Sequence, residues 1–152
     1  MRVHHKALVS LLLIFLAFPV SAIADDLIMR RIGMTFPETM SALQSSIVEE
    51  GFKVSRVQRV DIGLTSSGYN TAEYRIVFFM REDVLHDIVK KHPELIPYLP
   101  LKITIFAERS DTLLVTLNPM KLDEFFPDLE MQKTFSQWNE EVNRILDRVQ
   151  TE

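Results

Sequence analysis

The chain has 152 residues, of which 47% are hydrophobic and 25% are charged. This length and composition predict one globular domain with a core of its own. There is no cysteine, which excludes disulfides, thiolate metal sites, iron–sulfur clusters and a cysteine nucleophile.

The first 24 residues have the three-part pattern of a secretory signal peptide. Two basic residues precede the 14-residue apolar run Ala7–Val20, and small residues follow it up to Ala24. The run is shorter than the about 20 residues that span a bilayer. We therefore expect cleavage between Ala24 and Asp25, one domain over residues 25–152, and no stable membrane span after cleavage. An uncleaved N-terminal anchor is the alternative.

Charge and cysteine content indicate where the exported domain resides and what it avoids. Removing the leader takes away two basic residues, so the net charge changes from 17 − 21 = −4 to 15 − 21 = −6. An acidic surface without a basic cluster repels nucleic acid and anionic lipid. An exported protein without disulfides is typical of the bacterial periplasm, and we expect that location.

The first part of the domain is predicted to form a strand and then a helix. The strand covers Leu27–Ile32, and the helix begins after the N-cap Thr35, with Glu38 as the partner in a capping box. Gly51 is expected to end the helix. The apolar residues at helical spacing are Phe36, Met40, Leu43, Ile47 and Val48.

The central stretch Lys53–Met80 is predicted to be a long β-hairpin with a polar loop at Gly63–Thr71. Because the apolar residues of its first strand change parity, we expect a bulge near Val57–Gln58. In its second strand Tyr74, Ile76, Phe78 and Met80 alternate with Glu73, Arg75 and Val77. One face of this strand should pack on helices and the other should face water.

The second half adds a helix, two strands and a final helix. The expected segments are a helix over Arg81–His92, a rigid connector over Pro93–Pro100, strands over Leu101–Ala107 and Thr112–Asn118, a short helical piece through Phe126 and a long helix from Pro127. The inward residues of the first helix are Val84, Leu85, Ile88 and Val89, and those of the last are Met131, Phe135, Trp138, Val142, Ile145 and Val149. The order βαββαββα predicts an α+β two-layer sandwich, a mainly antiparallel sheet covered by helices.

Several runs resemble the "domain of unknown function 302" family. They are Arg56–Leu64, Tyr74–Phe79, Leu99–Ile103 and Leu117–Pro119, within a similarity that spans about Thr35 to Val149. The resemblance implies a small α+β domain with an antiparallel sheet, often dimeric, and it implies no activity. Many members carry a cysteine at the place of Leu101, so a thiol role cannot be carried over to this chain.

Five residues are candidates for ligand binding: Arg59, Asp61, Tyr69, Tyr74 and Tyr98. Arg59 and Asp61 are two apart on the predicted strand, where they could recognise an anion or a carboxyl group. The alternative is a row of cross-strand ion pairs with Glu73 and Arg75 on the solvent-exposed face of the sheet, without a functional role.

The aromatic candidates also have plainer interpretations. Tyr69 lies in the predicted hairpin loop, where long ordered loops carry binding groups but where mobile tips are also common. Tyr98 belongs to the apolar connector, which could line a pocket, face a second subunit or fill the end of the core.

Neither a catalytic motif nor a metal-binding motif is present in the sequence. The stretch around Ser66 and Ser67 lacks the GxSxG pattern of a hydrolase. His86 and His92, the histidines left after cleavage, are six apart and point about 240° apart on a helix. We therefore expect no cofactor and no metal. A haem held by one histidine and a methionine is the alternative; the methionines are Met29, Met34, Met40, Met80, Met120 and Met131.

The sequence thus predicts a small exported α+β domain that binds a ligand or pairs with itself. A cofactor carrier or small enzyme, and an interaction subunit of a periplasmic complex, are the alternatives. The expected partner is a small ligand, another protein or a second copy of the chain.

Overall fold

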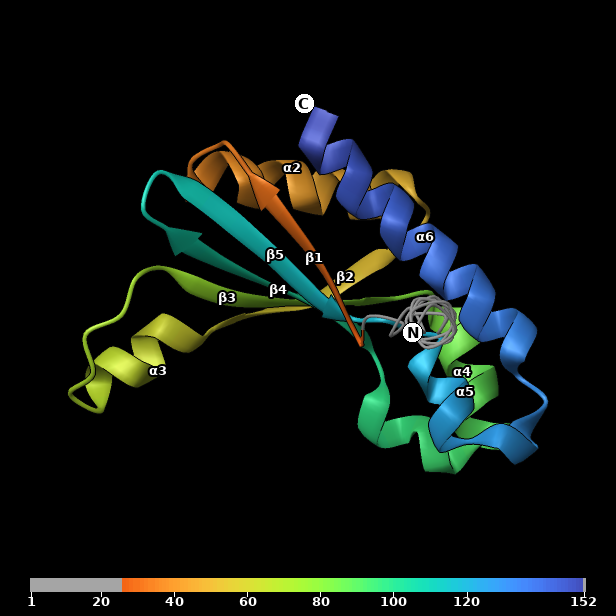
Figure 1. The fold of residues 1–152 in the computed structure, drawn as a ribbon. Coiled ribbons are helices and arrows are strands. Elements are labelled where there is room, and N and C mark those ends of the chain that lie inside the picture. Colours follow the sequence, from red (N-terminus) through yellow and green to blue (C-terminus); the bar gives the residue numbers. More distant parts are fainter. Residues whose placement is uncertain (1–25, 152) are drawn as a thin grey trace, which may run out of the picture.

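A computed structural model describes residues 26–151, so the predicted signal peptide and its cleavage site between Ala24 and Asp25 lie outside the described residues. A five-stranded antiparallel sheet has the strand order β1-β5-β4-β3-β2. Helices α2 and α6 pack against each other on one face of it (Figure 1). The predicted α+β two-layer architecture is confirmed.

The bounds of the elements are close to those expected from the sequence. The strands are β1 (Leu27–Ile32), β2 (Lys53–Arg59), β3 (Tyr74–Met80), β4 (Leu101–Glu108) and β5 (Asp111–Leu117). The α-helices are α2 (Phe36–Glu49), α3 (Val60–Ser66), α4 (Glu82–Lys91), α5 (Lys121–Phe125) and α6 (Gln132–Thr151), and two 3-10 helices are η1 (Pro93–Tyr98) and η2 (Pro127–Leu129). Among residues 26–151, no helix is long and apolar enough to cross a membrane.

Helix α6 supplies one half of the helical layer. All six residues of its predicted apolar stripe are buried in the core, although Met131 directly precedes the helix. The helix begins at Gln132 rather than at Pro127, which corrects the predicted start. Residues Pro127–Leu129 form a 3-10 turn, and Glu130 has a left-handed φ of 51°, which no α-helix accommodates.

Helix α2 supplies the other half. The Glu38 carboxylate accepts hydrogen bonds from the Thr35 backbone N–H at 3.1 Å and from its hydroxyl at 2.6 Å, so the start of the helix is held as predicted. The helix ends before Gly51, whose φ of 83° suits a residue without a Cβ. Val48 does not belong to the core, because 60% of it is exposed.

The first strand of the predicted hairpin is shorter than expected. Strand β2 ends at Arg59, and Val60–Ser66 forms helix α3 instead of continuing the strand. The neighbouring strand β3 begins only at Tyr74, so residues beyond Arg59 have little strand to pair with. Their backbone groups are satisfied within a helix instead.

The bulge in β2 lies between Val54 and Arg56, not near Val57–Gln58. It brings Val54 and Val57 to the same face, where both pack against the core. The hydroxyl of Ser55 donates a hydrogen bond to the Phe78 carbonyl oxygen at 3.2 Å. One extra residue in the strand thus explains the change in parity that the sequence shows.

In strand β3 the helix-covered face carries Arg75, Val77 and Phe79. Val77 and Phe79 are fully buried, whereas Ile76 and Phe78 are half-buried on the other face. The expectation that Arg75 belongs to the solvent-exposed face is therefore wrong.

The second half follows the prediction in outline. In α4 only Ile88 is buried, and Val89 is 40% exposed. The connector is the 3-10 helix η1 and not a strand, as predicted. Its Leu95 fills the core, while Ile96 and Tyr98 remain exposed.

Candidate functional surface

One face of the sheet carries no helix of the α2–α6 layer, and we call it the open face. Its members alternate along each strand with the buried core residues. They are Leu27, Met29 and Arg31 of β1; Asp111, Leu113, Val115 and Leu117 of β5; Lys102, Thr104, Phe106 and Glu108 of β4; Tyr74, Ile76 and Phe78 of β3; and Arg56 and Gln58 of β2.

The strand register arranges the open face in rows that run across the sheet. The central row is Met29–Val115–Thr104–Ile76–Gln58. On one side of it lies the row Arg31–Leu113–Phe106–Tyr74. On the other side Leu27 pairs with Leu117, and Lys102 pairs with Phe78, which pairs with Arg56. Thr104 therefore occupies the middle position of both the central row and the central strand.

The open face is more apolar than a solvated sheet face should be. A sheet that packs on one side normally alternates apolar residues with polar ones, but most open-face residues here are aliphatic or aromatic. Leu27 and Met29 are 49% and 54% exposed. The rings of Tyr74 and Phe106 contact each other at a centroid distance of 6.2 Å. The other apolar open-face residues are half-buried, except Leu113, which is 7% exposed. Apolar residues left partly exposed together on one face are a candidate interaction site.

Charged residues stand at the two ends of the open face. At the β4–β5 turn, Arg31 lies 2.5 Å from Glu108 and 3.4 Å from Asp111, and Arg109 lies in the turn itself, so these four charges sum to zero. At the opposite end are Lys102 and Arg56, neither of which forms an ion pair with any described residue. The open face is thus apolar in the middle, carries balanced charges at the β4–β5 turn and is basic at the opposite end.

Four of the five residues predicted to bind ligand gather near the start of β3. Arg59 pairs in register with Arg75, Asp61 forms an ion pair with Arg75, and Tyr74 lies on the open face. Tyr69 follows α3 and is 65% exposed.

Tyr98 is separate from these residues, because η1 and α3 lie at opposite ends of the molecule (Figure 1). Its ring stacks on Phe125 at 6.1 Å and meets Phe126 edge-on at 5.4 Å. No single site therefore contains all five residues.

Asp61 and Arg75 form a mostly buried ion pair and are not part of a row of solvent-exposed cross-strand charges. Their side chains are 15% and 11% exposed, and the Arg75 guanidinium lies 5.4 Å from the centre of the Phe36 ring. Desolvation raises the pKa of Asp61, but hydrogen bonds from Arg75 and the Ile62 backbone N–H, together with the charges of Arg75 and Arg59, outweigh it and hold the pKa below its ordinary value of 3.8. The pair anchors α3 to β3.

The lowered pKa predicts how stability depends on pH. A carboxyl group whose pKa is lower in the folded state stabilises the fold above its ordinary pKa, and this contribution is lost as the pH falls through the folded-state value. We expect Asp61→Asn to destabilise the protein by about 1–2 kcal/mol near neutral pH. The difference from wild type should shrink below pH 3.8, as measured by urea unfolding. An equal difference at both ends of the pH range would contradict this assignment.

Two shallow cavities flank the chain between α3 and β3. One of about 410 Å³ is lined by Asp61, Ile62, Thr65, Ser66, Thr71 and Glu73. The other, of about 390 Å³, is lined by Thr71–Tyr74, Phe106 and Ala107. The hydroxyls of Ser66 and Ser67 both donate to the Gly63 carbonyl oxygen, which satisfies them locally. The second cavity adjoins the Tyr74–Phe106 pair on the open face.

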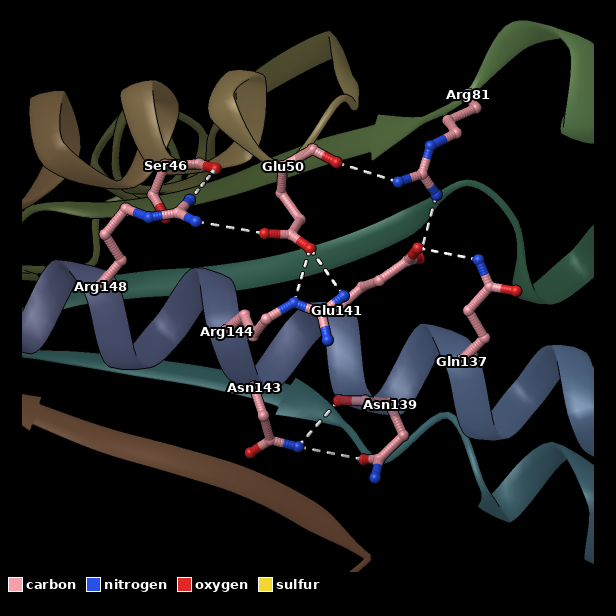
Figure 2. Close-up of polar contacts among 9 residues, drawn as sticks. All are labelled: Ser46, Glu50, Arg81, Gln137, Asn139, Glu141, Asn143, Arg144 and Arg148. Carbon is pink, nitrogen blue, oxygen red and sulfur yellow. Dashed lines mark hydrogen bonds and ion pairs between the residues drawn. The ribbon is translucent and has the colours of Figure 1, made fainter.

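A partly buried polar network joins α2, α6 and Arg81, the residue that follows β3 (Figure 2). Arg81 donates from Nη1 to the Glu141 carboxylate at 3.0 Å and from Nη2 to the Glu50 carbonyl oxygen at 2.9 Å. Its guanidinium also lies 3.9 Å from the centre of the Phe52 ring. The second oxygen of Glu141 accepts from Gln137 at 3.0 Å. Because Glu141 is only 4% exposed, this pairing is needed to keep its charge in the core.

The same network continues through the Glu50 side chain. Its carboxylate accepts from Arg144 at 2.7 Å and from Arg148 at 3.2 Å. Desolvation raises the pKa of Glu50, but these two arginines outweigh it and leave the pKa below its ordinary value. Sequence reasoning missed the network, although Glu141 falls on the apolar stripe of α6 between Trp138 and Ile145. Every charged group in the network has a partner. The network therefore holds α2 and α6 against the end of β3 and does not present a reactive group.

The arrangement of acids and histidines gives no metal centre in the part of the chain that the structure describes. Over residues 26–151, no three His, Cys, Asp or Glu side chains lie close enough together to hold an ion. The Nδ1 atom of His92 lies 3.6 Å from Glu94.

Comparison with known proteins identifies the family but no activity. A model of "Domain of unknown function DUF302" matches residues 28–149. The fold is similar to the "Crystal structure of uncharacterized conserved protein DUF302 from Bacillus stearothermophilus", with a TM-score of 0.76 and 19% identity over 83% of this chain and 99% of that one. No curated protein matches the chain. The match over nearly all of the described residues shows that this chain belongs to the DUF302 family.

Proposed function

We propose that this protein is an exported module that associates with a second copy of itself through the open face. The observation that carries the proposal is the apolar character of a sheet face that the α2–α6 layer leaves uncovered. Covering Leu27, Met29 and the half-buried residues of β3, β4 and β5 removes apolar surface from water, which favours association. Export is expected from the leader, and the periplasm from the absence of cysteine.

The two carboxylates at the β4–β5 turn and the unpaired basic residues at the opposite end favour a second copy as the occupant. If two open faces meet about a two-fold axis that runs across the strands, the β4–β5 turn of one copy lies over the basic end of the other. The unpaired Lys102 and Arg56 then approach Glu108 and Asp111 at both ends of the interface. Thr104 lies at the centre of this arrangement, opposite its own counterpart.

The proposal predicts that a charge at the middle of the open face disrupts association. Ile76→Lys places a lysine in the central row. Because both copies carry the substitution, a two-fold interface contains two such lysines. We expect this variant to weaken association at least about a hundredfold. Light scattering after size exclusion, over a range of concentrations, measures the change.

Val48→Lys is the matched control, since it also replaces a β-branched residue by lysine. Val48 is 60% exposed on α2, away from the open face, so its variant should have the mass of two chains, like wild type. Wild type that stays monomeric at about 100 µM overturns the proposal. So does equal association of wild type and Ile76→Lys.

A further inference from the structure

The two edges of the sheet differ in how well they are protected against an added strand. Strand β2 is interrupted by its bulge between Val54 and Arg56. Strand β1, at the other edge, has neither a bulge nor a proline, and pairs with β5 in unbroken register from Leu27 to Ile32. A regular edge of this kind is a template for a further strand.

The alternation of an antiparallel ladder shows which groups of β1 face outward. Asn118 donates its backbone N–H to the Asp26 carbonyl oxygen at 2.9 Å, so Asp26, Ile28 and Arg30 direct their backbone groups toward β5. Leu27 and Met29 then direct theirs away from the sheet. The Met29 carbonyl oxygen accepts from Arg30 Nη1 at 3.1 Å. Among the described residues, none bonds to the outward groups of Leu27 or to the Met29 N–H.

The outward edge of β1 borders a groove beside α6. A cavity of about 650 Å³ is lined by Asp26–Arg30, Asn118, Asn139 and Asn143. Figure 2 shows Asn139 and Asn143 on the side of α6 that faces β1. Asp26 and the four residues of β1 that line the cavity span about 16 Å at 3.3 Å per residue. An edge strand beside a helix is the arrangement in which domains bind peptides by strand addition.

The groove presents hydrogen-bonding groups but few uncompensated charges. Arg30 pairs with Asp147 at 3.0 Å and Asp26 pairs with Lys121 at 2.9 Å. Asn143 accepts from Arg30 at 3.1 Å and donates to the Asn139 carbonyl oxygen at 2.8 Å. The side-chain amide N–H groups of Asn139 donate to no residue in the range 26–151. An uncharged segment therefore matches the groove better than an acidic or basic one.

We propose that an extended, uncharged peptide segment of a partner protein binds in this groove as a sixth strand, alongside β1. Its backbone exchanges hydrogen bonds with Leu27 and accepts one from the Met29 N–H. A side chain that points toward α6 accepts from the Asn139 amide. The proposal does not depend on self-association, because it uses the edge of the sheet and not the open face.

The test uses the purified protein and a displayed library of random octapeptides as the probe. We expect uncharged peptides to be enriched, and binding to slow amide hydrogen exchange at Leu27 and Met29. Met29→Pro removes the outward N–H but no bond to β5, because proline is tolerated on the outer side of an edge strand. This variant should weaken binding about tenfold or more.

Two further variants separate backbone recognition from other effects. Met29→Ala keeps the N–H and should bind like wild type. Asn139→Leu, on the surface of α6, should weaken binding severalfold without unfolding the protein, and it decides the test if Met29→Pro proves unfolded by circular dichroism. The proposal is overturned if no peptide binds more tightly than about 100 µM. It is equally overturned if the enriched peptides bind Asn139→Leu and wild type alike and leave exchange at Leu27 and Met29 unchanged.

Discussion

Phe79→Ala is expected to lower the free energy of unfolding by about 4 kcal/mol, whereas Phe78→Ala should lower it by about half as much or less. The two residues are neighbours in β3 and identical in type, but they lie on opposite faces of the sheet. Phe79 is fully buried and meets Phe52 edge-on at a centroid distance of 5.3 Å. Removing its ring leaves a cavity under the helices that the surrounding core cannot fill.

Urea unfolding of the two variants and wild type measures this difference. Phe78 is half-buried on the open face, so its replacement should act mainly on self-association. The comparison should be made at protein concentrations low enough to dissociate copies, because association adds to the apparent stability. Equal losses for the two variants would show that the two faces of β3 are buried alike, contrary to the arrangement described above.

Arg81→Met should destabilise the protein by about 3 kcal/mol, because it leaves Glu141 charged and unpaired in the core. It also removes the donor to the Glu50 carbonyl oxygen at the end of α2 and the cation over the Phe52 ring. Methionine has a similar length, so the effect reports the lost charge and hydrogen bonds more than a cavity. Thermal or urea unfolding provides the measurement.

A double variant tests whether the pairing itself is responsible. Adding Glu141→Leu removes the stranded carboxylate, so the double variant should be more stable than the sum of the single losses predicts. Lys133→Met, at an exposed position of α6, should change stability by less than about 0.5 kcal/mol. Additive losses in the double variant would mean that Arg81 and Glu141 act independently.

Local sequence patterns were enough to predict the helical layer. The apolar stripe from Met131 through α6 and the capping box of α2 depend on residues three or four positions apart, and both are found in the structure. Helix α3 could not be found this way, because Val60–Ile62 has the composition of a strand. Its conformation depends on where β3 begins, which is set by pairing with β4 from Tyr74 onward.

The faces of the sheet were also beyond local patterns. Both faces of β3 are apolar, so alternation shows that there are two faces without showing which one the helices cover. Which face the helices cover depends on long-range contacts. Examples are the ion pair between Asp61 and Arg75 and the hydrogen bond between Arg81 and Glu141; the last two residues are 60 positions apart. For the same reason the open face emerges only once the register is known.

Cross-linking through one engineered cysteine tests the central claim, pairing of open faces, most directly. The natural chain has no cysteine, so Thr104→Cys places a single thiol at the centre of the open face. Packed sheets lie about 10 Å apart, within reach of a short bis-maleimide. The proposed pairing predicts rapid covalent dimers of Thr104→Cys and few of Val48→Cys, whose thiol lies on the outer side of α2. Monomers of Thr104→Cys, or equal cross-linking of the two variants, would contradict it.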